Sequence, residues 1–308
     1  MQRLAAESAA VEDRTISIQN RNELEAFLVE AEDKLVMLNV ETEALCDVGF
    51  DINDPAACAQ FKSDLARVAA ECEDVVFLNL DIEDSSEALA LSNELGVNKF
   101  PTQQYYKNGS LVWQHEGAGV GTMESVGEGV LYYGGQGAGG MSASKFITEV
   151  KSDDDLDDFL ELCALPETND MGVTLQVQCD KQLAVLDCSK LNDAPSCMAI
   201  FPAVLALAKN TAGATRWARL LCDADLTSAA LAQKYNVTQY PTFIFFADGK
   251  EVDRVVSADR MTLMNHVLQF QAANGVSMPQ PSARKRLSNS EAKKIAQAKR
   301  AAQKKQMF

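Results

Sequence analysis

The residues best suited to chemistry in this chain are cysteines, two of which stand near the start of predicted helices. Cys197 follows Ala194-Pro195-Ser196, and Cys58 follows Pro55-Ala56-Ala57. A thiolate attacks disulfides, and free N–H groups with the helix dipole stabilise it at a helix N-terminus. The pattern therefore makes Cys197 and Cys58 the candidate residues for thiol chemistry.

Each of these two cysteines could pair with an earlier one. Cys188 precedes Cys197 by nine residues, and Cys46 precedes Cys58 by twelve. Either intervening loop could bring its pair within the Cα separation of about 4.4–6.8 Å that a disulfide needs. The alternative is that these thiols are buried and inert.

The two histidines do not extend this chemistry. His115 falls in a predicted strand and His266 in a predicted helix, both away from the loops that carry the cysteines. The sequence therefore gives no support for a Cys-His nucleophile or a zinc site, and it implies no cofactor.

A repeated aromatic-Pro-Thr sequence indicates the helices and strands that position the cysteines. Phe100-Pro101-Thr102 and Tyr240-Pro241-Thr242 lie 140 residues apart, and each is followed by a strand, an Asn-Gly or Asp-Gly turn and a second strand. Proline cannot donate a hydrogen bond to a sheet, so a proline that opens a strand needs an edge, a bulge or a cis bond. We expect both X-Pro bonds to be cis.

Around these steps, strands alternate with helices in the same order twice. In the first unit Asp84 and Glu87 are expected to cap the helix that Gly96 ends. The predicted strands are 15–19, 34–40, 74–80, 146–150, 181–187 and 215–222, and the predicted helices include 20–32, 55–72, 152–163, 195–209, 226–236 and 259–271.

This order resembles the thioredoxin fold. The resemblance implies an α/β protein of two tandem thioredoxin-like domains, each with a central mixed sheet flanked by helices. In thioredoxins the helix starts with Cys-Gly-Pro-Cys and a proline follows five residues later; Cys197 and Pro202 match the second cysteine and that proline. Ala194 then stands at the first cysteine position.

By the same resemblance, Pro55 replaces the first cysteine of the first domain, and Cys58 is a vestigial inner thiol. Asp187 is similar to the buried acid that assists the inner cysteine, although its spacing is one residue longer than in the family. The substrate-binding loops would be Tyr240-Pro241-Thr242 and Phe100-Pro101. Because neither domain keeps the outer thiol, the two-cysteine cycle cannot run, and disulfide reductase activity should be weak.

The segment between the two units is rich in glycine. Ten of the 17 glycines fall in residues 117–140, which predicts a flexible connection, although Val130-Leu-Tyr-Tyr133 is apolar enough to pack on a domain or between the two. The expected divisions are an extension at 1–14, a first domain at 15–118, a linker at 119–145, a second domain at 146–274 and a tail at 275–308.

Charge is distributed unevenly. Residues 284–308 hold nine basic residues and one acidic residue, a balance of +8, whereas residues 1–283 hold 19 basic and 43 acidic residues, a balance of −24. The acidic body repels nucleic acid. The tail is expected to be helical. It is either a solvated helix or one that folds back on the acidic body, or it docks on an anionic partner.

The tandem arrangement resembles the chloroplast drought-induced stress proteins of plants and algae, through Gly129-Val-Leu-Tyr-Tyr-Gly134, Gln182–Asp187 and Cys197–Pro202. That resemblance implies the chloroplast stroma and thiol clients of the peroxiredoxin or methionine sulfoxide reductase type. The first 14 residues carry no signal or transit features, so the alternative location is the cytoplasm. No apolar run reaches the roughly 18 residues of a membrane span.

Three hypotheses follow. In the first, the protein takes part in thiol-disulfide redox homeostasis and stress response through Cys197, alone or with Cys188. In the second, it is a redox-inactive binding or scaffold module. In the third, it is a subunit of a larger complex docked by residues 284–308.

Overall fold

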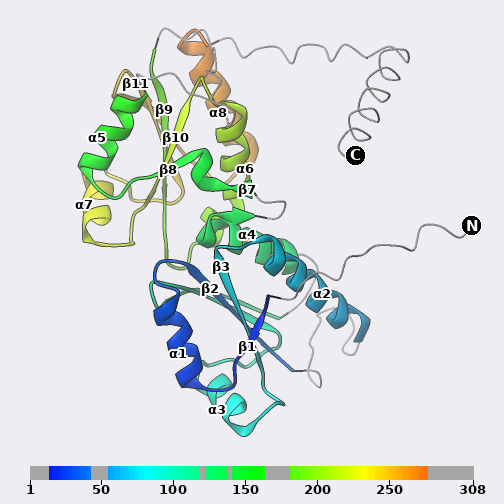
Figure 1. Cartoon of the computed structure of the whole chain (residues 1–308). Coiled ribbons are helices and arrows are strands. Elements are labelled where there is room, and N and C mark those ends of the chain that lie inside the picture. Colours follow the sequence, from blue (N-terminus) through cyan, green and yellow to red (C-terminus); the bar gives the residue numbers. More distant parts are fainter. Residues whose placement is uncertain (1–13, 43–54, 118–121, 138–140, 164–180, 277–308) are drawn as a thin grey trace, which may run out of the picture.

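The chain folds into two α/β domains stacked end to end (Figure 1). The computed structural model describes residues 14–42, 55–117, 122–137, 141–163 and 181–276, and within the helix that begins at Pro55 it describes side chains from Gln60 onward. Cys46, Cys179 and the basic tail at 284–308 lie outside the described residues.

Domain 1 contains five strands and four helices among the described residues. The strands are β1 (Ile16–Ser17), β2 (Leu35–Glu41), β3 (Val75–Asp81), β4 (Thr102–Lys107) and β5 (Ser110–Glu116), and the helices are α1 (Arg21–Glu30), α2 (Pro55–Glu71), α3 (Ser86–Glu94) and α4 (Thr122–Gly134). A short hairpin of β6 (Gln136–Gly137) and β7 (Met141–Ser142), then the 3-10 helix η1 (Ala143–Lys145), leads to domain 2.

Domain 2 repeats the order. Its strands are β8 (Ile147–Glu149), β9 (Leu183–Ser189), β10 (Arg216–Leu221), β11 (Thr242–Ala247) and β12 (Lys250–Val256), and its helices are α5 (Asp153–Leu162), α6 (Pro195–Asn210), α7 (Leu226–Lys234) and α8 (Arg260–Ala273).

The two sheets have the same topology. Domain 1 has the strand order β1-β3-β2-β4-β5, and domain 2 has β8-β10-β9-β11-β12. In domain 1, β2 and β3 are parallel, and β4 of the hairpin after the proline pairs antiparallel with β2. In domain 2, β9, β10 and β11 repeat this arrangement. This mixed sheet is the predicted fold class, and both Phe100–Pro101 and Tyr240–Pro241 are cis.

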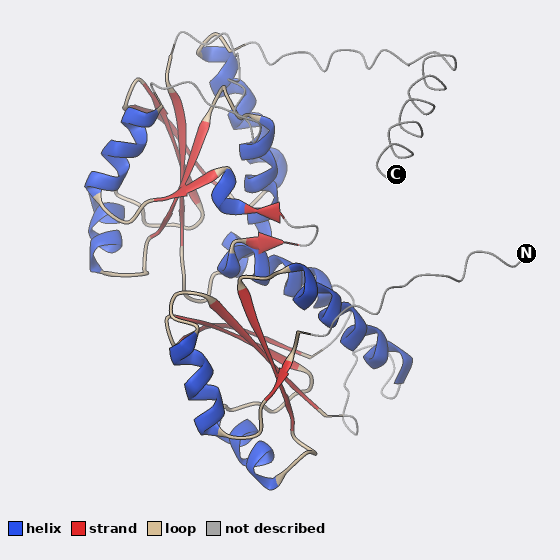
Figure 2. Ribbon diagram, viewed as in Figure 1, coloured by secondary structure: helices blue, strands red, loops and turns tan. Residues whose placement is uncertain are grey.

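Helices cover both faces of each sheet (Figure 2). In domain 2, side chains of α5 and α7 pack on one face, and side chains of α6 and α8 pack on the other. In domain 1, α1 and α3 share one face, and α2 and α4 share the other. Helix α4 therefore holds in domain 1 the place that the closing helix α8 holds in domain 2.

This placement corrects the prediction of a flexible linker at 119–145. Its glycines permit close packing: a Cβ at Gly129 would lie 2.9 Å from the Tyr105 ring, and one at Gly134 would lie 2.7 Å from Val75. Glycine lets the α4 backbone approach domain 1 where a larger side chain would collide. The apolar residues 130–133 are buried, in keeping with the expectation that they pack.

A smaller correction concerns α3. Its N-cap is Ser85, whose side chain accepts a hydrogen bond from the backbone N–H of Ala88, rather than Asp84 with Glu87. Asp84 lies one residue too early to reach the first free N–H groups, and serine is an equally good cap.

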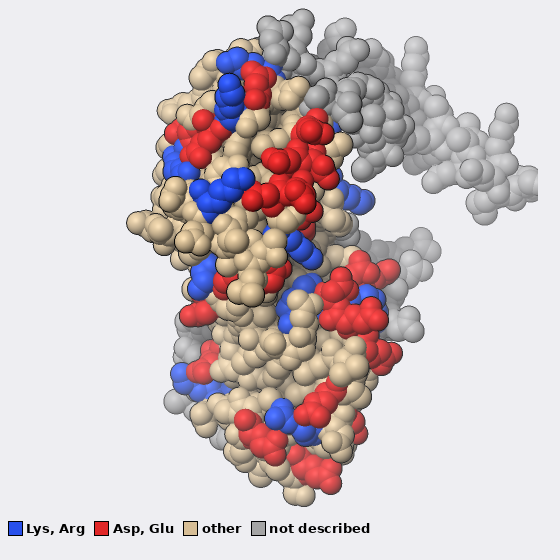
Figure 3. All heavy atoms as spheres, turned by 90° about the vertical axis from the view of Figure 1, so that its left-hand side faces the viewer, with Lys and Arg blue, Asp and Glu red and all other residues tan. Residues whose placement is uncertain are grey.

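The side of the molecule that carries α1 and α5 is charged (Figure 3). Acidic side chains gather there on the upper domain, in line with α5, which has three aspartates in its first turn. Since α6 covers the opposite face of the same sheet, this acidic surface lies away from Cys197. Among the helices that the structure describes, none has the length and apolar character needed to cross a membrane.

Candidate functional site

Cys197 lies in the first turn of α6, which Pro195 opens. Ala194 is the N-cap, and its side chain makes no hydrogen bond to the first turn of the helix. The Cys197 side chain is 2% exposed and belongs to a core that α6 shares with α4. Burial raises the pKa of its thiol to about 11, although contacts with the Lys190 backbone and the Ser189 hydroxyl offset part of that rise.

This environment makes Cys197 a poor nucleophile as it stands. The thiolate, not the thiol, attacks disulfides, and a pKa near 11 leaves only about one molecule in ten thousand ionised at pH 7. The helix N-terminus favours a thiolate, but here desolvation by the surrounding core outweighs it. Chemistry at Cys197 therefore requires a change in its surroundings.

Asp187 lies on β9 beneath the start of α6, with 1% of its side chain exposed. It accepts a hydrogen bond of 2.6 Å from the Ser189 hydroxyl. Burial raises the pKa of this carboxyl to about 6, and the Ser189 hydrogen bond and the Arg219 charge lower it in part. An Asp187 carboxyl that titrates near neutrality can exchange a proton with a nearby thiol, which is the role that the sequence suggested.

Arg219 is the cation of this site, and the sequence analysis missed it. It lies directly opposite Asp187 on β10, is fully enclosed, and pairs with Glu149 at 2.8 Å. Its guanidinium also donates to the Tyr132 carbonyl of α4 at 3.0 Å and lies 4.6 Å from the centre of the Phe201 ring. Arg219 interrupts the apolar run at 217–221, and a charge in such a run was the signal that could have revealed it.

The structure does not bring Cys188 and Cys197 together. Successive side chains of a strand point to opposite faces. Cys188 belongs to the core cluster on the α5 and α7 side, and Cys197 belongs to the cluster on the α6 side. The predicted pairing fails because Cys188 follows Asp187, which occupies the α6 face.

Cys188 instead neighbours a cysteine that the sequence analysis did not single out, Cys222. A hydrogen bond with the Cys222 thiol, and then burial, raise the pKa of Cys188 well above its ordinary value. Both thiols are free, and both are buried. High pKa and low exposure are properties of inert structural thiols.

The loop between β9 and α6 is held in place within domain 2 by Asp223. Its carboxylate accepts hydrogen bonds from the backbone N–H groups of Leu191 and Asn192, the second at 3.2 Å. The loop also has Asp193 in the left-handed region, at φ 45°. These features fix the path of the chain into Ala194 and the first turn of α6.

Domain 1 contacts the same loop. Tyr132 on α4 donates its hydroxyl to the Lys190 carbonyl, and the Asp193 N–H donates to the Val112 carbonyl of β5 at 3.0 Å. The loop that carries the candidate site is therefore an interdomain contact as well.

The two proline loops, predicted from the resemblance to bind substrate, lie at corresponding places in the two sheets. Thr242 pairs with Cys188 and Thr102 with Val40, so each loop sits at the end of the central strand where the next helix begins. Thr242 and Thr102 each donate a hydroxyl to the carbonyl three residues earlier, both at 2.7 Å. Pro101 and Pro241 are buried, and Phe100 and Tyr240 are half-buried.

The Cys46–Cys58 pairing lies outside what the structure describes. Cys46 is not among the described residues, and Cys58 falls in the part of α2 whose side chains are not described. In the described chain, no group of three or more His, Cys, Asp and Glu side chains is placed to hold a metal ion.

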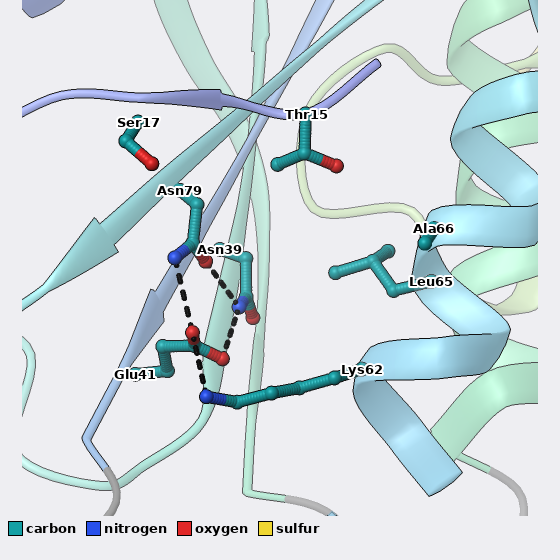
Figure 4. Close-up of a pocket in the computed structure, with 8 residues that line it drawn as sticks. All are labelled: Thr15, Ser17, Asn39, Glu41, Lys62, Leu65, Ala66 and Asn79. Carbon is teal, nitrogen blue, oxygen red and sulfur yellow. Dashed lines mark hydrogen bonds and ion pairs between the residues drawn. The ribbon is translucent and has the colours of Figure 1, made fainter. Parts of the chain in front are cut away.

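Domain 1 has a polar cavity of about 130 Å³ that is lined by residues of β1, β2, β3 and α2 (Figure 4). The Glu41 carboxylate lies at its centre, held by Lys62 at 3.1 Å, by Asn79 at 3.0 Å and by Asn39 at 3.1 Å. Asn39 in turn donates to Asn79 and accepts from Gln103. The Glu41 carboxylate is thus bonded on both oxygens, whereas the buried side-chain oxygen of Gln103 has no hydrogen-bond partner, and no thiol lines the cavity.

The comparisons with known proteins agree with this geometry. A family model described as Thioredoxin matches residues 174–269. The chain is 23% identical over 261 residues to the chloroplastic thioredoxin-like protein CDSP32 of Arabidopsis thaliana, a match that covers 85% of this chain and 75% of the relative. It is also 29% identical over 110 residues to the thioredoxin of Gallus gallus, covering 36% of this chain and 92% of that one.

Among solved structures, the thioredoxin of Fasciola hepatica is similar at 27% identity and a TM-score of 0.32, covering 40% of this chain and 99% of that one. The family match covers domain 2 with the Cys197 site, and the plant relative spans both domains. Residues 174–269 thus match the thioredoxin family, and the chain resembles the chloroplastic thioredoxin-like protein CDSP32 over most of its length.

Proposed function

We propose that this protein takes part in thiol-disulfide redox homeostasis and stress response through the single thiol of Cys197, with weak disulfide reductase activity. The observation that carries the proposal is the pair of residues at the start of α6: Ala194 at the cap and a buried Cys197 one turn inside. The inner position of a thioredoxin site is kept, and the outer nucleophile is missing.

The chemistry open to a lone thiol is one half of an exchange. The Cys197 thiolate attacks a client disulfide, forms a mixed disulfide with one client sulfur and releases the other as a thiolate. Without a second cysteine in the motif, an external small-molecule thiolate must attack the Cys197 sulfur of the mixed disulfide, which releases the client as a thiolate and leaves the small thiol bound to Cys197. A second small-molecule thiolate then attacks that disulfide, forms the small-molecule disulfide and releases the Cys197 thiolate. In this proposal Asp187, whose pKa burial raises to about 6, accepts the proton that Cys197 loses.

The partners that fit this proposal are thiol proteins of the peroxiredoxin or methionine sulfoxide reductase type, bound through Tyr240, Pro241 and Thr242. Extended client backbone commonly pairs with such a strand end. The chloroplast stroma is the proposed location, because the plant relative is named chloroplastic. Residues 284–308, with their +8 balance, stay a proposed docking segment for an anionic partner.

A second candidate function is a redox-inactive binding or scaffold module. It is favoured by the burial of Cys197, whose high pKa suppresses the thiolate. Phe100 and Pro101 in domain 1 would then serve as a second peptide-binding loop with no adjacent thiol chemistry.

Insulin reduction separates the two candidates. The unmodified protein should reduce insulin slowly in the presence of a small thiol, Cys197→Ser should abolish that activity, and Ala194→Cys should raise it several-fold by restoring the nucleophile at the helix N-terminus. Cys163→Ser is the matched control, since that thiol lies at the end of α5 in the same domain.

The outcomes are distinct. An activity unchanged by Cys197→Ser contradicts the single-thiol proposal and leaves the scaffold. A rate equal to that of an ordinary thioredoxin contradicts the scaffold. Mass spectrometry of the Cys197 peptide after incubation with a small aromatic disulfide adds a direct assay of the mixed disulfide.

A further inference from the structure

The face of domain 2 around Cys197 is covered by domain 1. Three groups of domain 1 meet the residues just before α6. The Tyr132 hydroxyl donates to the Lys190 carbonyl, and the Val112 carbonyl accepts from the Asp193 N–H at 3.0 Å. The third group is Tyr133, which follows Tyr132 on α4.

Tyr133 occupies the space in front of the α6 N-terminus. Its side chain is 4% exposed, and its hydroxyl faces the Ala194 backbone without a hydrogen bond of full geometry to any described residue. Burial and then the nearby Cys197 raise the pKa of this phenol. A client sulfur that approached Cys197 from the start of the helix would meet this ring.

The covering element belongs to domain 1 by its packing. The Tyr133 ring lies 5.9 Å from that of Tyr105 and 6.5 Å from that of Trp113, both on the domain 1 sheet. On the other side, the Tyr132 ring meets Phe201 of α6 edge-on at 5.3 Å. The Tyr133 ring thus packs on domain 1, and the Tyr132 ring packs on domain 2. A shift of α4 against the domain 1 sheet would therefore move both side chains next to the Cys197 site.

An ion pair near the middle of α4 also holds this helix against domain 2. Arg260, at the start of α8, contacts Glu128 of α4 at 3.2 Å and the Ala199 carbonyl of α6 at 3.1 Å. The Arg219 bond to the Tyr132 carbonyl adds a contact from inside domain 2. The contact between the domains is therefore made by directional bonds as well as by apolar packing.

We propose that α4 and β5 of domain 1 block the client-binding face of domain 2, and that Cys197 becomes reactive only when they move away from residues 190–194. This inference rests on the proposed single-thiol function and adds its regulation. The occupant of the client face is a segment of the same chain. A client must displace it, or a change in domain 1 must release it.

Two glycines of α4 supply a matched test. A Cβ at Gly129 would lie 2.9 Å from Tyr105 and 3.1 Å from Trp113, whereas a Cβ at Gly127 would meet nothing within 4 Å. Gly129→Ala should force α4 away from the domain 1 sheet. Gly127→Ala makes the same chemical change two residues earlier in the same helix and should leave the contact intact.

The readout is the alkylation rate of Cys197 by iodoacetamide in the full chain, followed by mass spectrometry. Gly129→Ala should raise this rate roughly tenfold or more, because exposure of a buried group follows the free energy of local opening. Gly127→Ala should match the unmodified protein. Cys188 and Cys72 are internal controls, buried in domain 2 and domain 1, and should stay unreactive.

Equal rates in the two glycine variants, or fast alkylation of Cys197 in the unmodified protein, would overturn the proposal. If Gly129→Ala also exposes Cys188 or Cys72, the variant has unfolded, and Tyr132→Phe then decides. It removes only the hydroxyl bonded to Lys190 and should raise Cys197 alkylation by about threefold. No increase in that variant would overturn the proposal as well.

Access and chemistry are measured separately. Iodoacetamide reports access to Cys197 whether or not the protein exchanges disulfides. Insulin reduction by the double variant Gly129→Ala with Ala194→Cys reports the chemistry, and it should exceed that of either single variant. Faster alkylation without faster reduction would support the blocked face and contradict the proposed function.

Discussion

The two domains place polar residues at the same positions of their central strands and use them differently. The register pairs Asn39 with Asn79 in domain 1, and it pairs Asp187 with Arg219 in domain 2. Domain 1 thus has two neutral amides where domain 2 has a buried acid and a buried cation. In domain 1 the negative charge lies two residues after Asn39, on Glu41. The side chain of its ion-pair partner, Lys62, is 42% exposed.

The difference shows what a thiol site demands of this fold. In domain 1 the carboxylate is bonded by three donors, and its cation is open to solvent, so the cluster is self-contained. In domain 2 the Asp187 carboxyl has one hydrogen bond, from Ser189, and its neighbouring cation is tied to α4. The second arrangement contains a carboxyl whose pKa burial raises to about 6, and its cation connects the site to the other domain.

Removing the buried cation should have the largest effect on stability. Arg219→Met leaves the Tyr132 carbonyl without its donor, removes the ion pair with Glu149 and takes away the positive charge near the buried Asp187, and uncompensated buried charge costs about 3 kcal/mol or more. Asn79→Ala, the matched change in domain 1, should cost about 1 kcal/mol. Urea unfolding followed by Trp113 and Trp217, one in each domain, measures both; equal losses would contradict the distinction.

The charge of Asp187 should make stability depend on pH in domain 2. Its folded pKa, about 6, is above the unfolded value near 3.8, so the folded state binds the proton more tightly. This contribution is fully present below pH 4 and is lost as the pH rises through 6, by roughly 3 kcal/mol.

Asp187→Asn should therefore be more stable than the unmodified protein at pH 8, and the difference should shrink toward pH 4. Thermal unfolding of both proteins across this range provides the measurement. Asn39→Asp, at the matching position, should introduce a similar slope in domain 1. A difference between Asp187→Asn and the unmodified protein that does not vary with pH would show that Asp187 keeps an ordinary pKa.

The smallest expected effect concerns the cavity in domain 1. Lys62→Met should cost about 0.5–1 kcal/mol, because Glu41 is largely buried but keeps its two amide donors, and solvent screens the half-exposed lysine. Lys234→Met, which removes an exposed pair with Asp153, should produce no measurable change. Urea unfolding midpoints at low and high salt test this prediction. The stability loss of Lys62→Met should persist at high salt, and Lys234→Met should show no loss at either salt concentration.

The sequence was sufficient for the elements that depend on local rules. The aromatic-Pro-Thr steps predicted the hairpins β4–β5 and β11–β12, and the strand next to Cys197 was found from its continuous apolar run. Helix α4 was not predicted, because glycine lowers helix propensity and only the Tyr105 and Val75 surfaces explain why glycine is needed there. Such tertiary contacts leave no local pattern.

The residues of the candidate site likewise divide into those that the sequence can predict and those that depend on tertiary contacts. Cys197 and Asp187 were proposed from their resemblance to thioredoxin positions, and strand alternation alone could have shown that Cys188 faces away from Cys197. Arg219 could have been suspected as a charge within an apolar strand. The roles of Tyr132 and Tyr133 depend on how two domains meet, which spacing within one domain does not report.

The position of α4 in the chain also has a consequence for synthesis on the ribosome. Domains commonly fold in order as they emerge, so domain 1 can close with α4 before most of domain 2 has been translated. The side of Tyr132 that later meets Phe201 would then be open to water and to chaperones until α6 arrives. We expect a pause in translation after residue 142 to prolong that exposure, so that the yield of soluble protein depends on how quickly the second half follows the first.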